Sequence, residues 1–166
     1  AMTPGTTPTV RDPSAPAPIR DAATVILVRD AARSPRVLMG RRGASAAFMP
    51  SKVVFPGGAV DSHDRDVPFA APLGPGCAAR LGAGRAGAFA AAAIRELAEE
   101  TGLFLARPGG WPAPVPPGWA DWARAGLLPD AGALSFVFRA ITPPGRTRRF
   151  DARFFVADAA HLTGDP

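Results

Sequence analysis

Residues 95–103 read R-E-L-A-E-E-T-G-L and end the strongest predicted helix in the sequence. Alanine is the best helix former and dominates the segment before them, so we expect one helix from about residue 86 to residue 101. Its apolar stripe, at three- and four-residue steps, consists of Ala90, Ala93, Ile94 and Leu97. Gly102 is a natural stop, because glycine readily adopts the left-handed conformation that ends many helices. The pattern predicts a helix with an apolar face and an acidic end.

Three carboxylates crowd one side of this helix. Glu99 and Glu100 follow Glu96 by three and four residues, so all three lie roughly opposite Leu97. Like charges at this spacing destabilise an isolated helix by roughly 0.2–0.5 kcal/mol per pair. Arg95 can pair with Glu99 one turn later, which leaves two carboxylates without a cation. Because Mg²⁺ takes oxygen ligands and bridges to substrate phosphates, the cluster predicts a divalent-metal site.

A solvated acidic surface is the alternative interpretation of the same segment. The loop F-P-G-G at residues 55–58 favours the metal site. A strand over residues 53–55 must stop at Pro56, and the two glycines after it permit a tight reversal. Bare backbone at Gly57 can therefore approach the helix and offer a carbonyl oxygen to the metal. The glycine loop and the acidic helix point to one shared site.

The rest of the chain is predicted to form short strands around this helix. Residues 1–19 are rich in Pro and Thr without periodicity, which predicts a disordered tail before one domain at residues 20–166. A loop is expected at about residues 65–85 and a short helix at 119–128. Strands are predicted at residues 24–28, 36–39, 53–55, 134–138 and 154–156. This order favours an α/β or α+β sandwich over a repeating βαβ unit.

Composition and charge bound the class of protein. With 166 residues, 47% of them hydrophobic, the chain is long enough for one domain with a core. No apolar run approaches the ~20 residues of a membrane span and the start lacks the order of a signal peptide, so we expect a cytoplasmic protein without membrane contact. The net charge of +5 suits anionic ligands. No Lys/Arg run marks a nucleic-acid arm, and the glutamates would repel a phosphate backbone.

Residues 95–103 resemble the second half of the Nudix box, R-E-U-x-E-E-x-G-U with U an apolar residue, at every fixed position. The first half starts at Gly58 and is preceded by F-P-G, as is common in that family. The segment between Gly58 and Arg95 is about 23 residues longer than in the usual box. Asp64 stands where the family usually has a glutamate that supports the arginine. The resemblance implies a Nudix-type α/β/α sandwich with a mixed sheet.

The family fold normally continues with a further strand and a closing helix. This chain stops at Pro166, soon after the predicted strand at residues 154–156, so we expect it to lack both elements. A sheet without them exposes an edge and apolar surface. Association between copies of the chain is therefore a further expectation.

An insertion inside the box is typical of one branch, similar to the mammalian peroxisomal and mitochondrial coenzyme A diphosphatases. Further stretches that resemble this branch are residues 41–42, 48–51, 54–58, 141–145 and 148–155. The resemblance implies metal-dependent hydrolysis of a diphosphate linkage in a small nucleotide-type molecule, with coenzyme A or acyl-coenzyme A as the favoured substrate. Alternatives that stay open are ADP-ribose, a dinucleotide or capped RNA as substrate, and a catalytically silent domain that binds nucleotide.

By the same resemblance, Mg²⁺ or Mn²⁺ is held by Glu96, Glu99, Glu100 and the Gly57 carbonyl, and Arg95 completes the catalytic group. Such a metal neutralises diphosphate oxygens and lowers the pKa of a bound water, so that hydroxide attacks phosphorus. Glu96 is a candidate general base. Guanidinium groups bind phosphates bidentately, and the candidates for this role are Arg41, Arg42, Arg148, Arg149 and Arg153. An exposed arginine on an arginine-rich surface is the alternative for each.

Overall fold

The computed structural model describes residues 17–41, 52–82 and 84–164. The predicted tail at residues 1–19 lies outside the described residues except for its last three. Within the described ranges, no helix is both long and apolar enough to cross a membrane.

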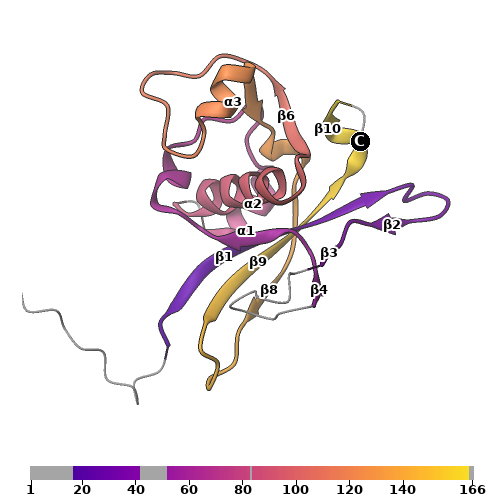
Figure 1. The fold of residues 1–166 in the computed structure, drawn as a ribbon, viewed down its shortest axis with the longest axis vertical. Coiled ribbons are helices and arrows are strands. Elements are labelled where there is room, and N and C mark those ends of the chain that lie inside the picture. The colour runs from indigo at the N-terminus through magenta and orange to yellow at the C-terminus, as the bar shows by residue number, and fades with distance from the viewer. Residues whose placement is uncertain (1–16, 42–51, 83, 165–166) are drawn as a thin grey trace, which may run out of the picture.

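A mixed sheet forms one layer of the fold (Figure 1). Its central strand, β1 (Ile19–Arg29), pairs in parallel with β9 (Arg149–Asp158), and β8 (Ser135–Ile141) runs antiparallel to β9. The other edge of β1 pairs antiparallel with β2 (Arg36–Val37) and β5 (Gly57–Ala59). Parallel and antiparallel strands around few helices confirm the predicted α+β class with a mixed sheet.

The two faces of this sheet differ because side chains alternate along each strand. On β1, the core residues that pack with the long helix are Ala23, Val25 and Leu27. The intervening Thr24 and Ile26 point to the opposite face and are only half-buried. β1 begins at Ile19, upstream of the predicted strand at residues 24–28, because β9 supplies hydrogen-bond partners along that whole stretch.

The long helix α2 (Ala86–Thr101) lies across one face of the sheet, as predicted from the alanine-rich segment (Figure 1). Its centre is fully buried from Ala90 to Ile94, and small side chains there allow close approach of the helix to the sheet. Gly102 ends the helix with a φ of 73°, and its N–H donates to the Ala98 carbonyl. The last turn leaves Glu99 and Glu100 exposed.

A second layer covers the side of α2 that faces away from the mixed sheet (Figure 1). It consists of β6 (Phe104–Pro108), β7 (Leu127–Pro129), β10 (Leu162–Thr163) and α3 (Ala120–Ala125). Trp119 and Trp122 are buried here, with ring centroids 5.0 Å apart. The helix predicted at residues 119–128 is present as α3 but ends three residues early, because Gly126 (φ 67°) terminates it and the following residues pair with β6.

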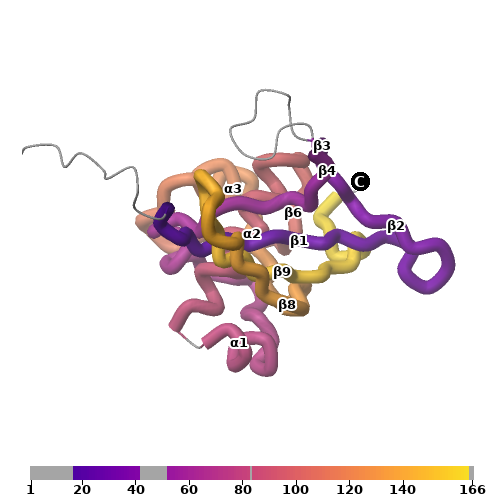
Figure 2. Tube along the Cα trace, turned by 90° about the horizontal axis from the view of Figure 1, so that it is seen from below, coloured from indigo at the N-terminus to yellow at the C-terminus, as the bar shows by residue number. Residues whose placement is uncertain are grey.

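The loop predicted at residues 65–85 contains helical structure. A 3-10 turn, η1 (Ser62–Asp66), enters it, and α1 (Pro75–Leu81) lies within it. Pro75 occupies the first turn of α1, where a missing N–H leaves no hydrogen bond unmade. Shorter elements are β3 (Gly40–Arg41), β4 (Val53–Val54), η2 (Ala131–Ala133) and η3 (Ala159–His161). Figure 2 shows the β1–β2 hairpin extending away from the other elements.

Candidate metal and diphosphate site

A buried ion pair joins α2 to η1, the 3-10 turn at residues 62–66. Arg95 donates from Nε to Asp64 Oδ1 and from Nη2 to Asp64 Oδ2, both at 3.1 Å. The two side chains are only 6% and 1% exposed. Nη2 also donates to the Ala59 carbonyl at 3.0 Å. Arg95 therefore joins α2 to η1 and β5, and the shorter Asp64 makes the contact that the usual glutamate would make.

The pKa of Arg95 shows how strongly its partners hold the charge. Burial alone would lower this pKa, but the hydrogen bond and charge of Asp64, followed by those of Glu96, raise it above its ordinary value. Arg95 consequently stays a cation in a site with little water. Its remaining nitrogen, Nη1, donates to Glu96 Oε1 at 2.9 Å and to Glu99 Oε2 at 3.3 Å.

The glycine loop lies directly against the glutamates. A Cβ added to Gly58 would stand 2.3 Å from Glu96 Cδ and 2.4 Å from each carboxylate oxygen. The Gly57 N–H donates to Glu100 Oε2 at 3.1 Å. Strand β5 thus brings bare backbone into contact with two carboxylates from successive turns of α2. The structure brings together the loop and the helix that the sequence assigned to one site.

The pKa of Glu96 lies above its ordinary value. Burial is the main cause; the charge and hydrogen bond of Arg95 oppose it, and the negative charges of Glu99 and Glu100 add to it. Glu96 is half-buried, whereas Glu99 is about half exposed at the helix surface. The environment around Glu96 therefore favours a bound proton or cation.

The donor set fits a hard divalent cation, since it offers carboxylate and backbone oxygens and Mg²⁺ or Mn²⁺ prefers such ligands. Burial, the main cause of the raised Glu96 pKa, and the neighbouring carboxylates both disfavour the bare negative charge, which a bound cation would offset. Within the described part of the chain, no three carboxylate, histidine or thiol groups converge into a metal-binding cluster. Instead, Arg95 Nη1 donates hydrogen bonds to the carboxylates of Glu96 and Glu99. The Glu100 carboxylate accepts a hydrogen bond from the Gly57 N–H.

Apart from Arg153, the candidate phosphate-binding arginines that the structure describes lie on β3 and in the β8–β9 hairpin. Arg41 is exposed on β3, opposite Val53 of β4. Arg42 lies outside the described residues. Arg148 is exposed in the turn before β9. Arg149 begins β9 and donates from Nε to the Thr142 carbonyl at 3.2 Å, a contact that closes the β8–β9 hairpin.

Arg153 occupies a different environment from the other candidates. It is buried on the α2-facing side of the sheet, with its guanidinium 4.4 Å from the ring centre of Phe89 and 2.5 Å from Asp151 Oδ1. Arg139 on β8 donates twice to the same carboxylate, at 2.7 Å. These contacts, led by the hydrogen bond from Arg139, hold the pKa of Asp151 below its ordinary value. Arg153 belongs to an ion-pair network across neighbouring strands.

One supporting feature was missed in the sequence. Asp61 and Asp64 form a capping box at the start of η1, in which the Asp61 N–H donates to Asp64 Oδ2 at 2.8 Å. This contact orients the carboxylate that receives Arg95. The D-x-x-D spacing before η1 resembles the general capping pattern of a helix start and could have indicated it.

Known proteins resemble this chain in structure and in sequence. A solved NUDIX hydrolase from Alicyclobacillus acidocaldarius shares 32% identity and a TM-score of 0.66, covering 90% of this chain and 73% of that one. The acyl-coenzyme A diphosphatase NUDT19 of Gallus gallus is 29% identical, covering 82% of this chain and 54% of its own length. The human protein of the same name is 31% identical, covering 73% and 47%.

The chain therefore spans about half the length of these curated relatives. No family model matches it. The solved relative nevertheless covers most of both chains at 32% identity, and the Nudix-box residues of this sequence meet in one place through Arg95, Gly57 and Gly58. This chain belongs to the Nudix hydrolase family.

Proposed function

We propose that the protein hydrolyses a diphosphate linkage in a small nucleotide-type substrate, with Mg²⁺ or Mn²⁺ as cofactor. The observation that carries the proposal is the contact of β5 with α2, where Gly58 lies against the Glu96 carboxylate and Gly57 donates to Glu100. Oxygen donors and bare backbone then face a common space. A cation held by these carboxylates would supply positive charge to the diphosphate oxygens, and the bare backbone would allow their close approach.

In this proposal Gly57, Glu96, Glu99 and Glu100 hold the metal, which supplies charge neutralisation and an ionised water when it is bound. Arg95 is a positioning residue, because its contacts with Asp64 and the Ala59 carbonyl fix the helix against the glycine loop. Glu96 is also the proposed general base, because its carboxylate lies against the bare backbone of Gly58 at the same site.

The favoured substrate is coenzyme A or an acyl-coenzyme A. The support is the box insertion together with two relatives that are named acyl-coenzyme A diphosphatases. ADP-ribose, a dinucleotide and capped RNA are the other diphosphates that the same chemistry would accept. A silent nucleotide-binding domain is the non-enzymatic alternative.

A substrate survey tests the proposal. The protein is incubated with Mg²⁺ or Mn²⁺ and, separately, coenzyme A, octanoyl-coenzyme A, ADP-ribose, a dinucleotide and capped RNA, with Glu100→Gln as the matched variant. Mass spectrometry should detect 3′,5′-ADP and phosphopantetheine or its acyl form, and Glu100→Gln should abolish their release. Metal-dependent binding without turnover of any compound would rule out the enzymatic proposal.

A further inference from the structure

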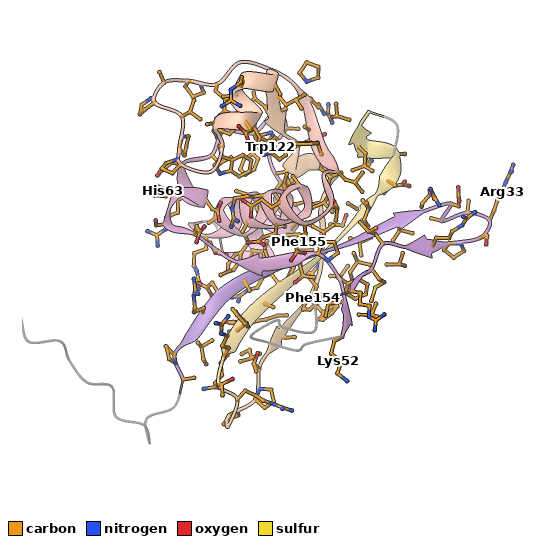
Figure 3. All side chains as sticks on the ribbon, in the orientation of Figure 1. Arg33, Lys52, His63, Trp122, Phe154 and Phe155 are labelled. Carbon is orange, nitrogen blue, oxygen red and sulfur yellow. The ribbon has the colours of Figure 1, made fainter. Side chains whose placement is uncertain are left out.

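A groove of about 890 Å³ lies on the face of the mixed sheet opposite α2. Its lining includes Ala22 and Thr24 of β1, and Ala152 and Phe154 of β9, which alternate with the α2-facing residues of both strands. Thr24 pairs with Phe154 and Ala22 with Ala152, so these side chains form a continuous floor. Figure 3 shows Phe154 on the same side as Lys52, and Phe155 on the side of α2.

Strand β5 separates this groove from the carboxylates by the width of one strand. A Cβ on Gly58 would collide with Glu96, whereas a Cβ on Gly57 would lie 2.6 Å from Thr24 Oγ1, on the groove side. Both glycines also line the groove. Because neither residue has a side chain, no side chain of β5 stands between Glu96 and the groove.

The walls of the groove are apolar and open to solvent. Val53, Ile141 and Met39 line it and are each more than two-fifths exposed. Phe154 stacks on Phe138 at a centroid distance of 4.2 Å, which extends the apolar surface to the sheet edge. Large apolar side chains gathered in an open concavity indicate a binding site, because exposed apolar residues that have no such role are usually scattered singly over the surface.

The lining favours an apolar chain over a nucleobase. Asn and Gln are the side chains that pair bidentately with adenine, and the sequence contains neither. No Asp or Glu lines the groove among the described residues. Of its threonines, Thr142 already accepts a hydrogen bond from the Phe150 N–H through Oγ1. Two cations, Lys52 and Arg146, also line the groove and suit the anionic end of an amphipathic ligand.

We propose that this groove holds the pantetheine arm of an acyl-coenzyme A substrate where it borders β5 and the acyl chain beyond it, and that it makes the protein prefer longer chains. The inference rests on the proposed function for the position of the diphosphate. Transfer of each buried methylene from water to an apolar site strengthens binding by up to about fourfold, so a groove of this character should discriminate chain length strongly.

The test compares the binding of octanoyl-coenzyme A and of coenzyme A to the whole chain, by calorimetry without metal so that no turnover occurs. The wild-type protein should bind the octanoyl form at least tenfold more tightly. Ala152→Trp, which fills the groove floor between the small residues Ala22 and Ala140, should reduce this ratio to below twofold. The matched control, Val137→Trp, places the same bulk at an exposed site on β8 outside the groove lining and should preserve the ratio.

A second variant guards against misfolding of Ala152→Trp. Val53→Ser removes an apolar wall at an exposed position and should lower the ratio by about threefold while thermal unfolding stays unchanged. The proposed role of the groove would be overturned by a wild-type affinity ratio near one, or by a ratio that Ala152→Trp and Val53→Ser leave unchanged. Light scattering that shows a dimer, separated into monomers by Ala152→Trp without any change in ligand ratio, would assign the groove to a second copy and also overturn it.

Hydrolysis measured on the same preparations with Mg²⁺ separates the two proposals. Turnover of coenzyme A without a chain-length preference would refute the groove alone. A binding ratio that Ala152→Trp removes, in a protein that hydrolyses neither compound, would support the groove and refute the proposed function.

Discussion

The two sides of β5 differ in the character of their side chains, which are charged and hydrogen-bonded toward α2 and apolar and exposed toward the groove. On the side of α2, Glu96 and Glu100 are fixed by hydrogen bonds to Arg95 and Gly57, and the charge of Arg95 is buried. On the groove side, Val53 and Ile141 are exposed and make the surface apolar. Chemistry at a diphosphate needs charges in fixed positions, whereas selection of a chain needs apolar area. Substitutions on the first side should change folding and turnover, and those on the second should change substrate preference.

The largest effect is expected from Arg95→Ala. It leaves the fully buried Asp64 carboxylate without its bidentate partner, so the free energy of unfolding should fall by about 3–5 kcal/mol. Urea denaturation measures this loss. The matched control is Arg124→Ala, which breaks the surface pair with Asp121 and should cost less than about 0.5 kcal/mol. Equal losses in the two variants would show that the Arg95 pair has no special structural role.

Glu96→Gln should preserve the fold and reduce turnover. The amide keeps the shape of the side chain beside Gly58 but removes its charge, so kcat should fall by about 100-fold or more. Steady-state kinetics with Mg²⁺ measures the change, and circular dichroism checks the fold. A loss smaller than tenfold would mean that Glu96 is neither a metal ligand nor the general base.

Gly58→Ala distinguishes the two glycines of β5. The three atoms nearest to its new methyl group all belong to the end of the flexible Glu96 side chain, so we expect a stable protein with kcat lowered by about tenfold or more as that carboxylate moves. Gly57→Ala meets the Ala23 carbonyl at 2.5 Å and should lower the melting temperature instead. Gly76→Ala, at an open position in α1, serves as the control and should leave kcat unchanged. Full activity in Gly58→Ala would contradict the close contact.

The smallest effect concerns the ion pairs across the sheet. Asp151 has a pKa below its ordinary value in the folded protein, so it contributes stability that is complete above the unfolded pKa of about 3.9 and is lost as pH falls through the folded value. The difference in unfolding free energy between wild type and Asp151→Asn should be constant near neutral pH and shrink below about pH 4. Urea titrations at several pH values test this, and a difference that grows in acid would refute the assignment.

Local signals in the sequence predicted the central features well. Alanine content and three- and four-residue spacing located α2, and Gly102 marked its end, because helix formation depends on neighbouring residues. The glycine pair before Ala59 indicated close backbone approach, and the structure has Gly58 against Glu96. The metal and phosphate assignments of these residues stay predictions, since they concern ligands.

Features that depend on distant contacts could not be predicted. Arg153 was predicted among the phosphate-binding arginines, but its contact with Phe89 depends on the packing of α2, and the parallel register of β1 and β9 brings Asp21 beside it. The groove likewise arises only when residues from five strands meet, and neither Lys52 nor Arg146 carries a local signal. α1 was missed because a mixture of Gly, Pro and Ala resembles a loop unless tertiary packing favours the helix.

Titration of Mn²⁺ into the whole protein, followed by electron paramagnetic resonance, tests most directly whether the carboxylates beside β5 form a metal site. A metal site here requires saturable binding that Glu100→Gln weakens at least tenfold, while Asp121→Asn, an exposed substitution on α3, leaves it unchanged. Equal Mn²⁺ affinity in wild type and Glu100→Gln would contradict it.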